Sequence, residues 1–244
     1  MIITIVIPTY NEAENLPRLV SALFALPLPE LRLLVVDDNS PDGTGQMAED
    51  LGKQYAGRIS VLHRPGKMGL GSAYRQGFQR ALDDGAEAVL QMDADFSHPV
   101  EKIPQLAETL SGCDIVIGSR YISGGSVDEN WPLWRKLLSG FGNLYARTIL
   151  GLKNHDVTGG FRLWKAATLK AMPFDRIRSN GYVFQVETCY VASRLGFIAR
   201  EVPIYFADRR WGKSKMNFRI QLEAALRVWT LLGMYRDLKP LKNE

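Results

Sequence analysis

Cysteine and histidine are scarce in this sequence, which limits the disulfide and metal chemistry that it can support. Its 244 residues include two cysteines, Cys113 and Cys189, and three histidines. The cysteines lie far apart in apolar surroundings, so we predict two free, buried thiols in a reducing compartment instead of a disulfide or a metal pair. The histidines, His63, His98 and His155, lack the spacing of zinc ligands.

Long apolar runs are also lacking. No run reaches the roughly 20 residues that a helix needs to cross a bilayer. The apolar segment at residues 2–8 is too short for a signal peptide, and no basic flank precedes it. We therefore expect a cytoplasmic protein that is soluble or bound peripherally to a membrane.

Three common catalytic or cofactor motifs are absent. Gly69 and Gly71 match part of the dinucleotide-binding fingerprint, but Tyr74 replaces its third glycine, and the segment follows the third expected strand instead of the first. Gly212–Ser214 looks like the end of a phosphate-binding loop, but the glycine required five residues earlier is Ala207. No Gly-x-Ser-x-Gly sequence is present, which argues against a serine-hydrolase elbow.

Charge is distributed unevenly along the chain. Residues 1–120 contain 10 Lys and Arg against 16 Asp and Glu, whereas residues 121–244 contain 20 against 10. A uniformly basic surface would suggest nucleic acid, which we do not predict as a partner. The uneven distribution suggests an acidic half that suits a metal ion and a basic half that meets an anion or an anionic surface. Solvated faces that merely differ in charge are the alternative.

The pattern of apolar residues predicts an α/β fold. Near-continuous apolar strands alternate with helices in the first half, which indicates a mostly parallel sheet covered by helices on both faces. The expected strands there are residues 2–8, 31–38, 58–64, 86–93 and 114–121, and the expected helices are 15–26, 43–55, 70–83 and 99–110. In the less regular second half we expect helices at 131–151, 182–196 and 220–235, a loop leading into a strand at 156–165, and a strand at 198–206.

Polar residues gather where the expected strands end. They follow four strands, in residues 8–12, 35–44, 92–99 and 118–121. Ligands of parallel α/β sheets bind beyond the carboxyl ends of the strands. The sequence therefore predicts a site at this edge of the sheet.

Asp93 and Asp95 are the most informative of these polar residues, because they follow a buried strand directly and are separated only by Ala94. Such a pair can hold a divalent cation, act as an acid and a base, or cap the next helix. A cap needs one carboxylate, and an acid/base pair usually draws its members from different elements. A cation removes the repulsion between the two charges, and hard carboxylate oxygens favour Mg²⁺ or Mn²⁺, which commonly bind substrate phosphates as well.

Seven segments occur in an order that is specific to one family. They are IVIPTYNEAENL, VVDDNSPDGT, GLGSAYRQGF, MDADFSHP, IGSRY, VTGGFRLW and RRWGKSK. Together they resemble the inverting family 2 glycosyltransferases with a GT-A fold, and most closely the dolichyl- or polyprenyl-phosphate mannose synthases. The resemblance implies a single GT-A domain over residues 1–244, with a nucleotide-binding half at 1–121, an acceptor-binding half at 122–215 and a C-terminal amphipathic helix at 216–244.

The resemblance also assigns roles to residues. The nucleotide-binding positions it implies are Pro8, Tyr10, Glu12, Val36 and Asp38. It places Mg²⁺ or Mn²⁺ on Asp93 and Asp95, with Ala94 lining the same loop. The basic residues implied to hold the phosphates of donor and acceptor are Arg120, Arg135, Arg209 and Lys215. Of all these, the catalytic set is Asp95, Arg120, Arg209 and Lys215. Some relatives have a glutamine metal ligand where this chain has Ser97, so Ser97 is left out of the metal set.

The implied reaction moves mannose from GDP-mannose to a dolichyl or polyprenyl monophosphate, with inversion and a divalent cation. A phosphate acceptor is already anionic at pH 7 and needs no general base, whereas a hydroxyl acceptor would need one. One alternative is a different donor, such as UDP-glucose, or a hydroxyl acceptor. The processive synthases that use hydroxyls carry Gln-x-x-Arg-Trp, and residues 208–211 here read DRRW without the glutamine. A non-catalytic sugar-nucleotide-binding subunit is the other alternative.

A lipid acceptor requires contact with a membrane, and two segments suit such an interface. The first contains Arg135 and Lys136 among the apolar residues Trp131, Leu133, Trp134, Leu137 and Leu138. The second is the helix at 220–235, with Leu222, Leu226, Trp229 and Leu232 on one side. Core-facing amphipathic helices would give the same pattern. Some relatives have C-terminal transmembrane helices, and this chain resembles the short form, which acts peripherally on the cytoplasmic face, alone or with a small membrane partner.

Overall fold

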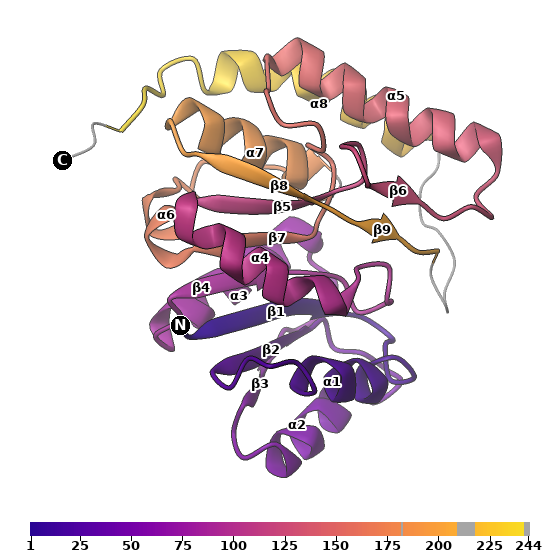
Figure 1. Ribbon diagram of the computed structural model, residues 1–244, viewed down its shortest axis with the longest axis vertical. Coiled ribbons are helices and arrows are strands. Elements are labelled where there is room, and N and C mark those ends of the chain that lie inside the picture. The colour runs from indigo at the N-terminus through magenta and orange to yellow at the C-terminus, as the bar shows by residue number, and fades with distance from the viewer. Residues whose placement is uncertain (182, 209–217, 242–244) are drawn as a thin grey trace.

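The structure is a computed structural model that describes residues 1–181, 183–208 and 218–241, and only the backbone of residues 218–224 (Figure 1). In this part of the chain a seven-stranded sheet has the order β3-β2-β1-β4-β7-β5-β8. Its strands are β1 (Ile3–Thr9), β2 (Leu31–Asp37), β3 (Ile59–His63), β4 (Ala88–Gln91), β5 (Ile115–Ser119), β7 (Arg162–Lys165) and β8 (Ala199–Pro203). The predicted α/β class with a mostly parallel sheet is confirmed.

Strand β7 departs from the parallel arrangement. It lies between β4 and β5 and is antiparallel to both, with Arg162 opposite Gln91 on one side and Ile117 on the other. An antiparallel strand begins at the edge where its parallel neighbours end. The loop that precedes β7 therefore lies at the carboxyl edge of the sheet, next to the ends of β4 and β5.

Helices cover both faces of the sheet, as its near-continuous apolar strands require. Helices α1 (Leu16–Phe24), α2 (Thr44–Gln54) and α4 (Ile103–Thr109) pack on one face, and short 3₁₀ turns at Val100–Lys102 and Leu110–Gly112 flank α4. Helices α3 (Leu70–Asp83), α6 (Ala166–Ala171) and α7 (Val183–Arg194) pack on the other face. Two apolar cores result, one on each side of the sheet.

Helix α3 approaches the sheet closely at Gly77. A Cβ atom at this position would lie 2.4 Å from Val6 Cγ1 in β1 and 3.0 Å from Val36 Cγ2 in β2. Only glycine fits without a shift of the helix or of the strands. This contact fixes the height of α3 above the sheet.

Two long helices form an additional layer over α7 (Figure 1). Helix α5 (Leu133–Leu150) packs against α8 (Phe218–Met234), and Tyr145 in α5 accepts a 2.8 Å hydrogen bond from Trp229 Nε1 in α8. The end of α8 is anchored by Tyr235, whose buried hydroxyl donates to Glu187 Oε1 at 2.6 Å. The same carboxylate accepts the N–H of Ser179 at 2.8 Å, so a buried acid ties α7, α8 and the 177–180 segment together.

The expected strand at 198–206 is divided in two. Strand β8 pairs with β5, whereas β9 (Tyr205–Phe206) pairs with β6 (Ser126–Val127) in a separate two-stranded parallel sheet. The change of partner occurs at Ile204, whose N–H donates to Ser119 and whose carbonyl accepts from Ser126. Strand β9 thereby leads the chain across the carboxyl edge of the main sheet.

Two simpler expectations concern the cysteines and the membrane. Cys113 and Cys189 are both buried and free, as predicted. In the described ranges no helix combines the length and the apolar character that crossing a membrane would take.

Candidate functional site

The Asp93–Ser97 turn follows β4 at the carboxyl edge of the sheet. Phe96 adopts a left-handed conformation with φ of 61°, which reverses the chain within this turn. The Ser97 N–H donates to Asp95 Oδ1 at 3.0 Å. Asp95 is 7% exposed and Ala94 is 3% exposed, so the turn is packed against the protein. The structure thus brings both predicted metal ligands to the same strand end.

The donor set of this turn fits a hard cation. Within the described residues, no cluster of three or more His, Cys, Asp or Glu side chains could hold a metal by itself. Mg²⁺ commonly binds to one or two carboxylates and takes the rest of its shell from water and substrate phosphates. Asp93 and Asp95 supply such a pair. Ser97 Oγ is buried without a hydrogen-bond partner in the part of the chain that the structure describes.

Two buried side chains hold Asp93. The Tyr74 hydroxyl, in α3, lies 3.1 Å from the Met92 carbonyl oxygen and 3.3 Å from Asp93 Oδ1. Burial and the neighbouring Asp93 charge raise the pKa of Tyr74 well above its usual value, so the hydroxyl keeps its proton. On the other side, the Asp93 N–H donates to His98 Nδ1 at 3.0 Å.

His98 is packed as a neutral ring. It stacks on Phe161 at 5.0 Å and meets the edge of Phe206 at 5.5 Å. Burial lowers the pKa of His98, although the nearby Asp93 and Asp95 carboxylates oppose this effect. Because Nδ1 accepts a hydrogen bond, the proton of the neutral ring is on Nε2.

Arg120 follows β5 and forms a buried ion pair with Asp156, in the loop before β7. Arg120 Nε lies 2.7 Å from Asp156 Oδ2, and Nη2 lies 2.8 Å from Oδ1 and 2.8 Å from Thr158 Oγ1. Burial alone would lower the pKa of Arg120, but the charge of Asp156 raises it above its usual value. Burial alone would raise the pKa of Asp156, but the Arg120 charge and hydrogen bonds lower it. Both groups are therefore ionised at neutral pH.

The loop before β7 is held in place from two further elements. Glu201, in β8, accepts the N–H groups of His155 and Asp156, each at 2.9 Å. Asn143, in α5, accepts the Val157 N–H at 2.8 Å. Asp156 is thus fixed independently of its arginine partner.

Phe206 lies between the Asp93–Ser97 turn with its neighbour His98 and the Arg120 ion pair. Its ring meets His98, lies 5.3 Å from the Arg120 guanidinium carbon, and meets the Trp131 ring edge-on at 5.8 Å. The next residue, Ala207, donates its N–H to Ser97 O at 3.3 Å. Strand β9 therefore ties the Asp93–Ser97 turn to the start of α5 and to the Arg120 ion pair.

The other predicted basic residues have different locations. Arg135, at the start of α5, lies 3.7 Å above the Trp131 ring and pairs with Asp208 at 3.0 Å. Arg209 and Lys215 lie outside the described residues. The phosphate-binding roles of all these residues, and of Arg120, stay predictions.

The predicted nucleotide-binding residues lie at the ends of β1 and β2. Pro8 and Val36 are register partners in the two strands. The Tyr10 ring lies 3.5 Å beneath the Lys67 ammonium group. The Glu12 N–H donates to Thr44 Oγ1 at 2.9 Å.

Asp38 is less available than the sequence suggested, because Arg64 pairs with it. Arg64 Nη1 lies 2.5 Å from Asp38 Oδ1, and Nη2 donates to Ser72. Burial raises the pKa of Asp38, while the Arg64 charge opposes this shift. The preceding Asp37 is buried and accepts hydrogen bonds from Thr9 Oγ1 at 3.1 Å and from neighbouring turn groups, which indicates a structural role.

Sequence reasoning missed Tyr74, His98, Asp156 and Phe206. The signals were present, since the first three lie in or beside the ordered segments quoted above. Tyr74 was considered only as a missing glycine, and His98 only as a zinc ligand. Their actual partners are fixed by the tertiary structure.

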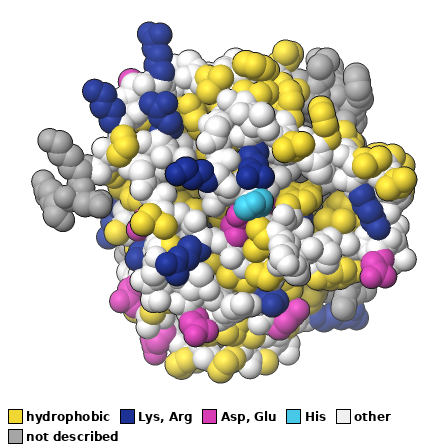
Figure 2. Space-filling view, turned by 45° about the horizontal axis from the view of Figure 1, so that its top comes forward, with side chains coloured by type: hydrophobic (Ala, Val, Ile, Leu, Met, Phe, Trp, Pro, Cys, Tyr) yellow, Lys and Arg dark blue, Asp and Glu magenta, His cyan; other side chains and the backbone are white. Residues whose placement is uncertain are grey.

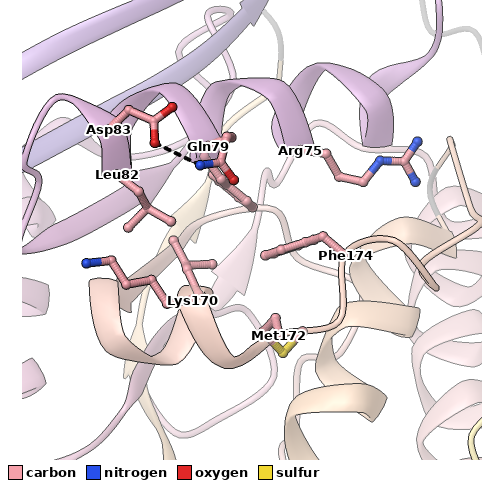
Figure 3. A pocket seen from close by; sticks show the side chains of 9 residues that line it. Arg75, Gln79, Leu82, Asp83, Lys170, Met172 and Phe174 are labelled. Atoms are coloured by element: carbon pink, nitrogen blue, oxygen red, sulfur yellow. Dashed lines mark hydrogen bonds between the residues drawn. The ribbon is translucent and has the colours of Figure 1, made fainter.

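A separate pocket of about 360 Å³ lies between α3 and α6 (Figure 3). Gln79 and Asp83 line it from α3 and are joined by a 2.8 Å hydrogen bond, while Lys170 lines it from α6. None of the predicted site residues lines this pocket. It is therefore distinct from the carboxyl edge of the sheet.

An exposed apolar surface covers α5 and α8, and hydrophobic side chains gather over much of the upper and right part of Figure 2. We call it the α5/α8 surface, and it comprises Leu133, Trp134, Leu137, Phe141, Leu144, Leu226 and Trp229, each more than half exposed. Phe141 and Leu144 were not predicted. Trp131 is 7% exposed, so its assignment to a membrane-facing surface is wrong, and the Leu222 side chain lies outside the described part.

Comparison with known proteins gives consistent results at the levels of family, sequence and fold. Residues 4–172 match the family model for glycosyl transferase family 2. The chain is 44% identical over 236 residues to an undecaprenyl-phosphate mannosyltransferase of Micrococcus luteus, covering 96% of each chain. It is 42% identical over 232 residues to a polyprenol monophosphomannose synthase of Mycolicibacterium smegmatis, covering 94% of this chain and 87% of the relative.

Among solved structures, the fold is similar to glucosyl-3-phosphoglycerate synthase of Mycobacterium tuberculosis in complex with Mn²⁺ and uridine-diphosphate-glucose. The TM-score is 0.64, with 19% identity, covering 98% of this chain and 80% of the other. At this identity the likeness shows the fold alone, and that fold agrees with the GT-A expectation.

Proposed function

The chain belongs to glycosyl transferase family 2 and is a glycosyltransferase, and from this premise we propose that it transfers mannose from GDP-mannose to a polyprenyl or dolichyl monophosphate. Two relatives that are 42–44% identical over nearly the whole chain are named undecaprenyl-phosphate mannosyltransferase and polyprenol monophosphomannose synthase, which supports a mannosyl transfer to a polyprenyl phosphate. The observation that carries the proposal is the Asp93–Ser97 turn. It lies at one sheet edge, with the predicted nucleotide-binding strand ends of β1 and β2 on one side and Arg120, directly after β5, on the other.

We propose that Asp93 and Asp95 hold Mg²⁺ or Mn²⁺ together with the diphosphate of the donor. When bound, the cation stabilises the negative charge that develops on the departing nucleotide. Pro8, Tyr10, Glu12, Val36 and Asp38 would bind the nucleoside at the ends of β1 and β2. Because Asp38 is paired with Arg64, a contact to the base or ribose would use a carboxylate whose orientation is already fixed.

The proposed acceptor needs no proton removed. A lipid monophosphate is already anionic at neutral pH, and its oxygen attacks the anomeric carbon from the face opposite the leaving group, which inverts the configuration. His98 is the histidine nearest to the Asp93–Ser97 turn, but its Nδ1 is engaged by the Asp93 N–H and its ring is buried between aromatic side chains. It is therefore unsuited to act as a general base, in agreement with a phosphate acceptor.

Basic residues would hold the acceptor phosphate. The proposal uses Arg120, Arg135, Arg209 and Lys215, each contributing about 1.5–3 kcal/mol if it makes a charge-assisted hydrogen bond. Arg120 Nε and Nη2 already bind Asp156, so its part is to present a positive charge from a fixed position. The ion pair between Arg135 and Asp208 is partly exposed. Arg135 would leave this pair and bind the phosphate instead.

The α5/α8 surface would place the enzyme on the bilayer that holds the lipid. Its α5 members are spaced three or four residues apart or adjacent, so they form one stripe along the helix. Arg135 and Lys136 begin the same helix and suit anionic headgroups. The cytoplasmic face, and a small membrane partner that shares this surface, are part of the same proposal.

The test is a transfer assay with purified protein, Mn²⁺ or Mg²⁺, a short polyprenyl phosphate and labelled GDP-mannose or UDP-glucose. We expect lipid-linked mannose, and product from neither donor would refute the proposal. Asp95→Ala should abolish turnover, while Asp50→Ala, an exposed carboxylate on α2 paired with Lys53, should not. Lys215→Ala should raise the KM for the lipid phosphate, and unchanged acceptor kinetics would remove it from the site.

A further inference from the structure

We infer that Tyr74 and His98 are positioning residues that hold Asp93 in the orientation that binds the cation. Tyr74 contacts the side chain of Asp93, and His98 contacts its backbone N–H. The inference rests on the proposed function, because it assumes that Asp93 is a metal ligand. It concerns residues outside the predicted donor, acceptor and metal sets. Its basis is that two buried groups, one in α3 and one at the end of the Asp93–Ser97 turn, both contact this single aspartate.

Tyr74 reaches Asp93 from the core of the protein. The residue is fully buried in α3, and its ring is nearly parallel to that of Phe184, with centroids 5.9 Å apart. Phe78 packs against it at 5.6 Å. These contacts fix the hydroxyl at the end of β4, where the Met92 carbonyl oxygen and Asp93 Oδ1 are both within hydrogen-bond distance. One hydroxyl proton is shared between these two acceptors, so the hydroxyl holds the carboxylate and the strand end together.

His98 reaches Asp93 from the far end of the turn. Its Nδ1 accepts the Asp93 N–H at 3.0 Å, which closes the turn across five residues. The ring cannot rotate freely, because Phe161 stacks on one face and Phe206 meets it edge-on. The backbone of Asp93 is thus fixed by a side chain whose own position is set by Phe161, directly before β7, and by Phe206 in β9.

The two contacts together determine the direction of the carboxylate. Hydrogen bonds to metal-binding side chains orient the ligand, and their loss typically weakens metal binding about 10–100-fold. A site that depends on two protein carboxylates has few ligands to compensate for a misplaced one. We therefore expect the removal of either contact to cost more free energy of cation binding than free energy of unfolding.

The variants separate positioning from packing. Tyr74→Phe removes only the hydroxyl. His98→Leu removes the acceptor, whereas His98→Asn keeps it, because Asn Oδ1 occupies nearly the place of Nδ1. Tyr190→Phe is the matched control, since it also removes the hydroxyl of a buried tyrosine. Tyr190 lies on α7, and its ring packs against that of Tyr235 with centroids 6.4 Å apart.

The readout is Mn²⁺ affinity in the presence of GDP or UDP, measured by electron paramagnetic resonance of free Mn²⁺, with thermal unfolding in parallel. Tyr74→Phe and His98→Leu should each raise the Kd for Mn²⁺ about 10-fold, and the Mn²⁺ concentration for half-maximal turnover should rise equally. His98→Asn and Tyr190→Phe should stay within about 3-fold of the wild type, by the same scale.

The outcomes distinguish this inference from the proposed function. If the wild type binds Mn²⁺ and Asp95→Ala does not, but Tyr74→Phe and His98→Leu bind as the wild type does, the inference is wrong and the proposed function stands. Equal losses of Mn²⁺ affinity in His98→Asn and His98→Leu would also overturn it for His98. A wild type that binds no Mn²⁺ with either nucleotide would overturn both.

Discussion

The buried ion pair between Asp156 and Arg120 makes a quantitative prediction about stability. Asp156 has a fully buried side chain, and the Arg120 side chain is 9% exposed. Replacing Asp156 by Asn keeps the shape of the side chain and much of its capacity to accept the N–H of Gly159, now 2.9 Å away. It removes the negative charge, and Arg120 is left buried without its counter-ion.

The magnitude follows from that burial. Removing one partner of a buried ion pair costs about 3–5 kcal/mol in unfolding free energy, because the remaining charge stays desolvated. In a domain of 150–250 residues each kcal/mol shifts the melting temperature by about 2–4 °C, so we expect Asp156→Asn to melt about 6–20 °C lower. Thermal and urea unfolding followed by circular dichroism would measure both quantities.

A surface pair provides the control. Arg80 Nε and Asp84 Oδ2 are 2.8 Å apart, nearly the same distance as in the buried pair, but the side chains are 47% and 40% exposed. Exposed pairs contribute about 0.2–1 kcal/mol, so Asp84→Asn should cost less than about 1 kcal/mol. If Asp156→Asn costs no more than Asp84→Asn, the argument from burial is refuted.

The same pair determines a response to acid. The pKa of Asp156 is lowered in the folded protein, because Arg120 outweighs the effect of burial. Its contribution is therefore fully present above the ordinary aspartate pKa of about 4 and is lost as the pH falls through the lowered folded pKa. Below about pH 4 the wild type should lose stability more steeply than Asp156→Asn does, and parallel pH profiles would contradict this assignment.

Three further predictions test other parts of the structure. Tyr235→Phe removes the hydroxyl donor to the buried Glu187 and should lower the unfolding free energy by about 1–3 kcal/mol, measured in urea. Gly77→Ala places a Cβ 2.4 Å from a methyl group of β1, and overpacking should exceed the gain in helix propensity, with a net loss of about 1 kcal/mol or more. Leu137→Ser should weaken binding to anionic vesicles about 10-fold. Ile198→Ser, at a residue of similar exposure outside the α5/α8 surface, should not weaken it. Equal effects of the two variants would exclude the α5/α8 surface as the membrane-binding surface.

The parallel part of the fold could be predicted because its signals are local. The helix expected at 70–83 is α3 with the same bounds, and the strand expected at 31–38 is β2 with one residue fewer. A buried parallel strand reads as a continuous apolar run wherever it lies in the sheet. The ordering of such runs with helices is enough to indicate the class of fold.

The position and direction of β7 could not be predicted in the same way. Its four residues indicate a strand, but nothing in them specifies that it lies between β4 and β5 or runs antiparallel to both. The Asp156 ion pair depends on that placement, since its partner is 36 residues away. Asp93 and Asp95 were recognisable from their spacing, whereas Tyr74 and His98 became identifiable only once the packing around the turn was known.

The apolar residues of α5 show a different limit. Trp131, just before α5, and Trp134, in its first turn, are the same residue type with similar neighbours, yet Trp131 is buried against Phe206 whereas Trp134 is 65% exposed. Helical periodicity identifies an apolar stripe on a helix, but it does not show whether that stripe packs against the rest of the protein or faces solvent. That choice depends on β9 and α8, which come much later in the chain.

The insertion of β7 between two earlier strands has a consequence for how the chain folds during synthesis. Until residues 162–165 are available, β4 and β5 have no strand between them, and each has an unpaired backbone edge. A nascent chain that ends before residue 162 therefore exposes unpaired strand edges on β4 and on both sides of β5, because β8 also comes later in the chain. Non-local closure of this kind slows folding, so the unpaired edges stay prone to aggregation until β7 and β8 have both been synthesised.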